Sequence, residues 1–360
     1  MTNKDYMLWL SSLVSGMSSR KLNSLLEIFG TAQAVFSAAE AELCRSIRLT
    51  DKEKKTVFER RNREYIEELK SLLESRQISY ISQDCDSFPT LLREIPDPPI
   101  GIFVVGNLPD DDTNKVAVIG SRTCSEYGRL TARCLSKPLA KAGVIIVSGM
   151  ARGVDSVAHR AALDAGGKTI AVLGCGVDVC YPRENEGLRE EIISNGCVIS
   201  EYPPGTRPLP YHFPARNRII SGISRGVIVT EATNKSGTMI TVDQALDQGR
   251  EVFAIPGDIN RELSKGTNRL IKDGAHVTLS HTDILETLHI DTKPAESGGS
   301  KNLQPNEIHV LGIIDFEPRG FDALLDQASV TNGELHLTLT ALEIKGLVRR
   351  LPGSRYVKND

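Results

Sequence analysis

One loop of the sequence combines a glycine, a hydroxyl and an arginine, which is chemistry that binds phosphate. Gly120-Ser121-Arg122 directly follows the apolar run 116–119 and precedes a helix expected to begin near Ser125. Glycine lets the backbone approach a ligand closely, the N–H groups of a helix N-terminus attract an anion, and arginine forks onto phosphate oxygens. The structural alternative is a tight turn with a solvated arginine, and the position between strand and helix favours phosphate binding.

A second loop has the same character. Lys235-Ser236-Gly237-Thr238 lies between the apolar run 227–230 and another expected helix. Lys235 offers a point charge, and the backbone N–H groups that follow it are placed to surround a phosphate. The alternative is a simple N-cap. A polyanion that crosses the sheet edge would satisfy both loops together, whereas a mononucleotide needs only one.

Two more stretches bring glycine, basic and aromatic residues to the same region. In one, Gly149 and Gly153 free the backbone around Arg152, which is expected to face the ligand. In the other, Phe213-Pro214-Ala215-Arg216-Asn217-Arg218, the two arginines are two positions apart and so point in different directions on a helix. One arginine is expected to meet the ligand while the other supports the fold. Phe213 is either a base-stacking residue or a core anchor.

The elements that hold these loops are short apolar strands separated by helical stretches. Strands that are apolar throughout are typical of a parallel sheet covered by helices on both faces, and such sheets bind ligands at the carboxyl ends of their strands. The pattern predicts an α/β fold with a doubly wound, mostly parallel sheet. The expected strands are 116–119, 144–147, 169–173, 198–200, 227–230 and 251–255.

Changes of composition divide the chain into four regions. Residues 1–75 are charged and leucine-rich with helical spacing, which predicts a small all-α domain with a helical hairpin ahead of a sheet domain at 80–290. Residues 291–303 lack apolar periodicity and are predicted to form a flexible linker. Residues 304–360 are predicted to be a winged helix, built from helices at 306–316, 321–327 and 333–344 and a hairpin at 347–357.

Composition predicts a soluble protein of the cytoplasm. No run of about 18 apolar residues is present to cross a membrane, and the N-terminus lacks the pattern of a secretory signal. The formal net charge of −3 argues against coating duplex DNA through bulk charge, so basic residues that bind nucleic acid must be focused in one groove. The seven cysteines include no CxxC pair, which favours reduced thiols over a metal site.

Catalytic and cofactor motifs are missing from the sequence. No GxGxxG follows the first strand of the expected sheet, no Walker A sequence is present, and neither a GxSxG elbow nor HExxH occurs. The acids near the expected site are Asp155, Asp178 and Glu231, which fall in different loops without a spacing for paired acid–base work. We therefore expect no catalytic residue, no metal and no cofactor.

The order and wording of these loops resemble the DprA (Smf) family of DNA-processing proteins. The resemblance is dense from about residue 115 to 280 and looser in the two end regions. It is carried by ordered motifs at 118–122 (VIGSR), 148–159 (SGMARGVDSVAH), 176–183 (GVDVCYPR), 200–205 (SEYPPG), 213–220 (FPARNRII), 235–238 (KSGT), 252–257 (VFAIPG) and 266–271 (GTNRLI).

This resemblance implies an extended Rossmann-like core and an N-terminal all-α domain that is SAM-like or helix-hairpin-helix-like. It also implies a homodimer that binds single-stranded DNA, protects incoming DNA and loads the RecA recombinase onto it during natural transformation, without being an enzyme. The family's phosphate-binding loop falls on residues 120–122, and its Lys-Ser-Gly loop falls on 235–237. Two departures stand out. Relatives often carry Gly-x-Gly where this chain has Gly16-Met17-Ser18, and residues 304–360 contain six Lys/Arg against eight Asp/Glu. Both argue against strong DNA binding by the end regions, and the second favours a protein-contact or regulatory role for the winged helix.

Two other classes of function stay open at this point. A nucleotide-cleaving phosphoribohydrolase would hold a nucleoside monophosphate in the two loops and use Glu231 as its acid, although a second well-placed carboxylate is missing. A sensor would bind a small nucleotide without turnover and signal through the winged helix.

Overall fold

The computed structural model describes residues 1–291, 303–315 and 318–358. The chain forms two compact units, Met1–Lys293 and Pro294–Asp360. The first, here called the larger unit, contains the helical region and the sheet. The second is called the winged-helix unit.

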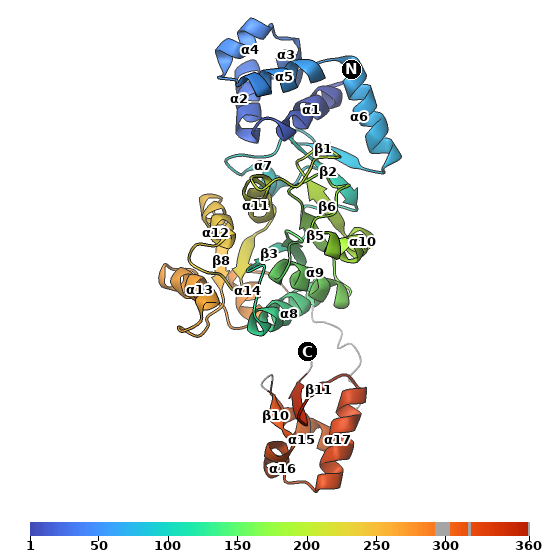
Figure 1. Ribbon diagram of the computed structural model, residues 1–360, viewed down its shortest axis with the longest axis vertical. Coiled ribbons are helices and arrows are strands. Elements are labelled where there is room, and N and C mark those ends of the chain that lie inside the picture. Colours follow the sequence, from blue (N-terminus) through green and yellow to red (C-terminus); the bar gives the residue numbers. More distant parts are fainter. Residues whose placement is uncertain (292–302, 316–317, 359–360) are drawn as a thin grey trace. The chain divides into compact units, whose positions relative to one another are not determined.

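A nine-stranded sheet forms the centre of the larger unit (Figure 1). Its strand order is β1-β2-β6-β5-β4-β3-β7-β8-β9. The strands β6, β5, β4, β3, β7, β8 and β9 run parallel to one another, whereas β2 pairs antiparallel with both β1 and β6. The strands are β1 Ser79–Ser82, β2 Gly101–Gly106, β3 Lys115–Ile119, β4 Ile145–Ser148, β5 Thr169–Val172, β6 Cys197–Ser200, β7 Gly226–Val229, β8 Glu251–Ala254 and β9 His276–Val277.

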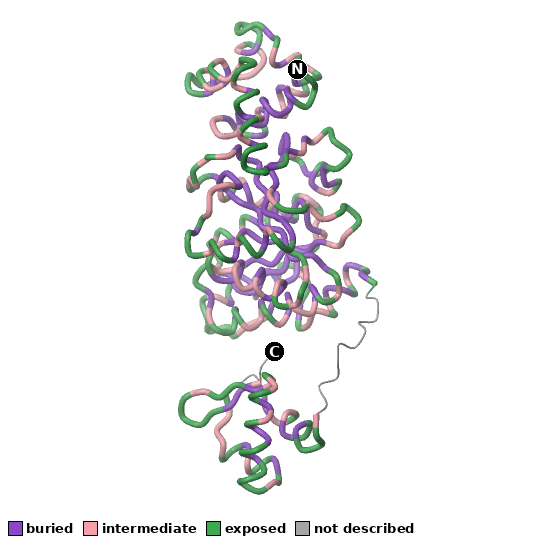
Figure 2. Tube along the Cα trace, turned by 90° about the vertical axis from the view of Figure 1, so that its right-hand side faces the viewer, coloured by how far each residue is buried: buried purple, intermediate pink, exposed green. Residues whose placement is uncertain are grey.

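Helices cover both faces of this sheet, and the alternation of side chains along β3 shows how. Val116 and Val118 pack with apolar residues of α8 and α9 in one core cluster, while Ala117 and Ile119 pack with residues of α11 and α12 in another. Buried residues accordingly gather along the sheet in Figure 2. The helices around it are α7 Thr90–Arg93, α8 Glu126–Lys141, α9 Val154–Asp164, η2 Arg183–Asn185, α10 Glu186–Asn195, α11 His212–Gly222, α12 Gly237–Asp247, α13 Glu262–Lys272 and α14 His281–Thr287.

The strand order reverses between β3 and β7. From β3 the chain adds β4, β5 and β6 on one side, and it then returns to place β7 against the other side of β3. The loops that follow β3 and β7 therefore separate towards opposite faces of the sheet and leave a crevice at its carboxyl edge. Doubly wound sheets bind their ligands at such a switch point.

The helical region packs directly on the sheet. The fully buried Trp9, Leu10 and Leu13 belong to the same core cluster as Tyr80 of β1 and Phe103 of β2. This shared core explains why the helices and the sheet form one compact unit. The helices are α1 Asn3–Ser12, η1 Leu13–Ser15, α2 Ser19–Phe29, α3 Ala32–Ser37, α4 Glu40–Ser46, α5 Asp51–Arg60 and α6 Arg63–Ser75.

The winged-helix unit has its own small core of apolar residues, which includes Val310, Leu324, Leu335 and Tyr356. Three helices pack around this core, and a three-stranded sheet of order β10-β12-β11 completes it. The elements are α15 Pro305–Ile313, β10 Arg319–Gly320, α16 Phe321–Ala328, α17 Asn332–Ile344, β11 Val348–Leu351 and β12 Arg355–Lys358.

The predicted fold class is confirmed, and each of the six predicted strands is present with its ends shifted by at most one residue. The strands β1, β2 and β9 were not predicted, because two of them pair antiparallel at one edge and the third has only two residues. The helix predicted at 306–316 ends earlier, at Ile313. The predicted linker lies almost wholly outside the described residues. None of the seven cysteines, which all lie in the described residues, forms a disulfide, and no described helix combines the length and the apolar character that a membrane span requires.

His159 makes the stability of the larger unit sensitive to mild acid. Its ring is fully buried in α9, and Nδ1 lies 2.7 Å from the Thr169 hydroxyl, which itself donates to the Ile146 carbonyl. Burial lowers the pKa of His159 from 6.5 to about 3. Below pH 6.5 His159 therefore binds a proton in the unfolded chain but stays neutral in the folded chain. The free energy of unfolding decreases as the pH falls towards 3.

We expect the titration of His159 to lower the free energy of unfolding by about 1.4 kcal/mol when the pH falls from 7.5 to 5.5. Urea titrations of the wild type and His159→Gln at the two pH values measure the effect. The loss between the two pH values should be smaller in the variant by about that amount. Equal losses in the two proteins would show that His159 does not stay neutral in the fold.

Candidate nucleic-acid interface

A pocket of about 560 Å³ lies at the switch point between β3 and β7. The loops after these two strands form opposite walls, and α11 forms a third. Most of the residues singled out in the sequence line this pocket. They are Gly120, Ser121, Arg122, Phe213, Arg216, Asn217, Ser236, Gly237 and Thr238.

The two loops predicted to bind phosphate, residues 120–122 and 235–238, are here called the phosphate-type loops, and polar contacts join them. The Thr238 hydroxyl at the start of α12 donates to the Gly120 carbonyl over 3.2 Å. Glu231, after β7, accepts hydrogen bonds from the Ser125 backbone N–H at 2.9 Å and from the Ser125 hydroxyl at 2.5 Å, at the N-terminus of α8. The Glu231 residue is only 1% exposed. Its carboxylate therefore holds the loops together and does not face the pocket as a free acid.

The N-terminus of α12 is open towards an anion. Its N-cap residue, Ser236, makes no side-chain hydrogen bond to the helix backbone, and Gly237 at the first helical position is exposed. Unsatisfied N–H groups at a helix N-terminus carry partial positive charge and bind phosphate oxygens. Both Ser236 and Gly237 line the pocket.

Arg122, Phe213 and Tyr181 form a platform on one wall of the pocket. The exposed Arg122 places its guanidinium 5.6 Å from the centre of the Phe213 ring, and the Tyr181 ring centre lies 5.4 Å from that of Phe213. A cation stacked on an aromatic ring, with a second ring beside it, offers a nucleotide both a phosphate contact and a stacking surface. Tyr181 was not selected from the sequence, although it lies inside the GVDVCYPR motif.

Arg216 is a buried charge beneath the pocket. Its Nη1 donates to the Gly149 carbonyl at 2.8 Å and to the Val172 carbonyl, and a side chain at Gly149 would collide with its guanidinium. Burial lowers the pKa of Arg216 to about 10, although the nearby Asp155 carboxylate has the opposite effect and raises it. Asp155 in turn accepts hydrogen bonds from the backbone of Gly149 and Ala151. Arg216 thus shapes the loop that follows β4 and places positive charge under the pocket.

Four other predicted residues lie around the pocket. Arg152 and Gly149 line a small adjoining pocket of about 80 Å³, where Arg152 forms a two-bond ion pair with Glu184 at 2.7 Å. Gly153 has a φ of +76° and backs against the Ser121 carbonyl, where a side chain would collide. Lys235 is exposed just before α12 and forms no ion pair within the described part of the chain, but its side chain does not line the pocket.

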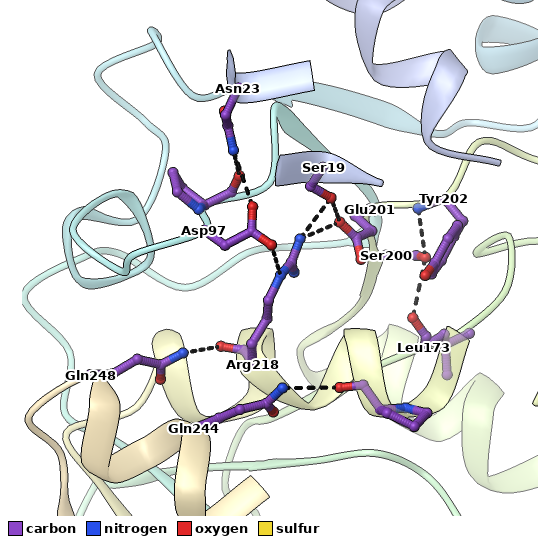
Figure 3. A network of polar contacts seen from close by, with 12 residues as sticks. Ser19, Asn23, Asp97, Leu173, Ser200, Glu201, Tyr202, Arg218, Gln244 and Gln248 are labelled. Carbon is purple, nitrogen blue, oxygen red and sulfur yellow. Dashed lines mark hydrogen bonds and ion pairs between the residues drawn. The ribbon is translucent and has the colours of Figure 1, made fainter. Parts of the chain in front are cut away.

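Arg218 does not reach this pocket, contrary to the sequence-based assignment. Its side chain is buried on another face of α11, where Nη2 donates to Glu201 at 2.6 Å and to the Ser19 hydroxyl at 2.8 Å, and Nε lies 3.3 Å from Asp97 (Figure 3). Burial opposes its charge, but the two carboxylates outweigh this and raise the pKa of Arg218. The two-residue spacing on a helix explains the division: Arg216 faces the pocket and Arg218 joins the sheet to the helical region.

Family models match both units of the chain. The model described as DNA recombination-mediator protein A matches residues 79–289, and the DprA winged helix domain matches residues 294–354. Protein Smf of Synechocystis is 31% identical over 99% of this chain and 99% of its own length. The DNA processing protein DprA of Streptococcus pneumoniae is 50% identical over 200 residues, which is 56% of this chain and 71% of that protein.

Solved structures agree with these matches. The X-ray structure of DNA processing protein A from Streptococcus pneumoniae has a TM-score of 0.67 at 37% identity and covers 79% of this chain and 98% of that chain. The protein from Helicobacter pylori, described for its unique single-stranded DNA binding mode, has a TM-score of 0.55 at 34% identity over 60% of this chain and 98% of that chain. With a relative matched from end to end and family models on both units, this chain belongs to the DprA (Smf) family of DNA-processing proteins.

Proposed function

We propose that the chain binds single-stranded DNA in the pocket between β3 and β7, as a protein without catalytic activity. The observation that carries the proposal is the joining of two phosphate-type loops at one switch point, with the exposed Arg122 stacked on Phe213 between them. Two anion sites side by side suit a chain of phosphates better than a single phosphate. The single-stranded DNA binding described for the Helicobacter pylori relative supports the same choice.

The wider role that we propose is to protect incoming DNA and to load the RecA recombinase onto it during natural transformation, in the cytoplasm. Family membership supports this role. We also propose that the protein acts as a homodimer. Leu279, two residues after β9, is 78% exposed, Val277 of that strand is 51% exposed, and Ile259 in the loop after β8 is 79% exposed. Since β9 pairs only with β8 among the described strands, its outer edge and these apolar side chains offer a surface for a second copy.

The enzyme alternative is disfavoured by the position of its acid. A phosphoribohydrolase reading needs Glu231 to meet a nucleotide, and the structure places that carboxylate on Ser125 with 1% of the residue exposed. Release of free base from a nucleoside monophosphate, lost in Arg122→Ala or Glu231→Gln, would revive this alternative. A nucleotide sensor is distinguished by tight binding of a mononucleotide without turnover.

Fluorescence anisotropy of a labelled oligothymidylate tests the proposed function directly. We expect binding that weakens with salt, with a log–log slope of about −0.7 for each phosphate neutralised. Neither duplex DNA nor a mononucleotide in excess should displace the oligonucleotide. No binding at low salt would overturn the proposal, and displacement by a mononucleotide would favour the sensor.

A further inference from the structure

A second pocket follows the first along the seam between α11 and α12. It has a volume of about 490 Å³, and its other walls come from the turn before α2, the N-terminus of α5 and the loop after α7. Along α11, Phe213 and Asn217 line the first pocket, whereas Ala215 and Arg218 line the second. The second pocket therefore lies between the sheet and the helical region, and nothing in the proposed site accounts for it.

One face of α12 runs through both pockets. Its N-terminal half lines the first pocket and its C-terminal half lines the second, at positions three or four residues apart, which share one face of a helix. The helix has eleven residues and so extends for about 16 Å. The two pockets thus follow one another along this face of α12, and between them Gln244, which lines the second, donates to the carbonyl of Pro214, which lines the first, at 3.2 Å. The residues along this face are Gly237, Thr238, Ile240, Thr241, Gln244 and Asp247 of α12, and Gln248 directly after the helix.

The Arg218 network forms the floor of the second pocket and fixes its shape. Figure 3 shows the guanidinium between Asp97, Glu201 and Ser19 of α2. Gln248, directly after α12, donates to the Arg218 carbonyl at 3.0 Å. The charge of Arg218 is neutralised by its two carboxylates, so the floor offers no strong attraction to a further anion. Its role is to hold the helical region against α11.

The rim of the second pocket carries the groups that a nucleic acid strand needs. Tyr211 is 60% exposed there, which leaves its ring available for stacking on a base. Arg20 and Lys52 of the helical region line the same pocket, are exposed and form no ion pair with described residues. Of the acids on the rim, Glu53 is paired with Lys21 at 2.7 Å, and Asp247 is exposed. Among the described residues of the rim, two cations, Arg20 and Lys52, therefore stand against one acid without an ion pair, Asp247.

We propose that the second pocket continues the single-stranded DNA site. A strand that leaves the pocket at Arg122 follows α12 to the helical region, where a base stacks on Tyr211 and phosphates meet Arg20 and Lys52. This inference rests on the proposed function. It gives the helical region a direct share in DNA binding through side chains on its surface, and not through the backbone of a helix-hairpin-helix turn.

Charge reversal at Lys52 tests the inference with oligothymidylates of about 4 and about 16 nucleotides, the range of site sizes of single-strand binding folds. In Lys52→Glu we expect the longer oligonucleotide to bind several-fold more weakly and the salt slope to fall by about 0.7, while the short one binds as it does to the wild type. Tyr211→Ala should weaken only the longer oligonucleotide, by about fivefold or more, and Tyr211→Phe should restore it.

Lys55→Glu is the matched control, since this lysine lies on the same helix, has a side chain that is 73% exposed and lies outside the pocket. The inference is overturned if Lys52→Glu and Tyr211→Ala bind both oligonucleotides as tightly as this control does. It is also overturned if they bind the short and the long oligonucleotide more weakly by the same factor. Those results leave the proposed function intact as long as Arg122→Ala still weakens binding. Failure of the wild type to bind either oligonucleotide would instead overturn the proposed function.

Discussion

Arg122→Ala is expected to weaken single-stranded DNA binding by about ten- to a hundredfold, the value of a hydrogen bond to a charged group. Arg122 is exposed, and its guanidinium is stacked on Phe213 in the pocket between the two phosphate-type loops. Because the contact is to phosphate, the loss should be nearly the same for every base composition, and the salt slope should flatten by a fraction of a unit. Anisotropy titrations at two salt concentrations measure both quantities.

Arg129→Ala is the control for this result. Arg129 lies on α8, the helix that begins just after Arg122, and its side chain is 48% exposed beside Glu126. The substitution removes the same charge without touching the pocket. If Arg122→Ala binds as tightly as Arg129→Ala while remaining folded, the site has been placed wrongly. A loss that depends strongly on base composition would indicate that Arg122 contacts bases.

Arg216→Met is expected to destabilise the larger unit by about 3–5 kcal/mol. The substitution leaves the Gly149 and Val172 carbonyls without their donor and removes the positive charge that faces the buried Asp155. Burial already raises the pKa of Asp155, so the loss of its neighbouring cation makes its charged form still less favourable. Urea denaturation followed by circular dichroism gives the change in unfolding free energy.

The double variant Arg216→Met with Asp155→Asn shows whether the buried charge is the cause. We expect it to be more stable than Arg216→Met alone, because the second substitution removes the carboxylate that has lost its partner. A decrease of less than about 1 kcal/mol in Arg216→Met would contradict the buried position of this arginine. Weak DNA binding by Arg216→Met would not by itself identify a DNA contact, since the loop after β4 depends on the same side chain.

Local signals in the sequence were enough to predict the sheet and the phosphate-type loops. The apolar strands and the glycine-bearing turns that follow them are properties of short segments, and the rule that ligands bind at the carboxyl ends of parallel strands supplies the rest. The loops at Gly120 and Ser236 therefore belong to one predicted site, and they line one pocket in the structure.

Which residues of a motif face that pocket depended on long-range contacts that no local pattern contains. Arg218 and Arg216 are equally basic and two positions apart, yet one is paired with Glu201 and Ser19 and the other lies under the pocket. Arg152 is held by Glu184, which lies 32 positions further along the chain.

The same division applies to Glu231 and to the second pocket. Glu231 was a candidate acid by its position after β7, and only the packing of α8 revealed that Ser125 occupies its carboxylate. The second pocket is formed by the helical region, α11 and α12, which are distant in sequence. Residue type and spacing thus determined which chemistry this chain carries, because they act within a few residues. The partner of each charge was decided by the tertiary structure, because burial and ion pairing depend on which distant segments the fold brings together.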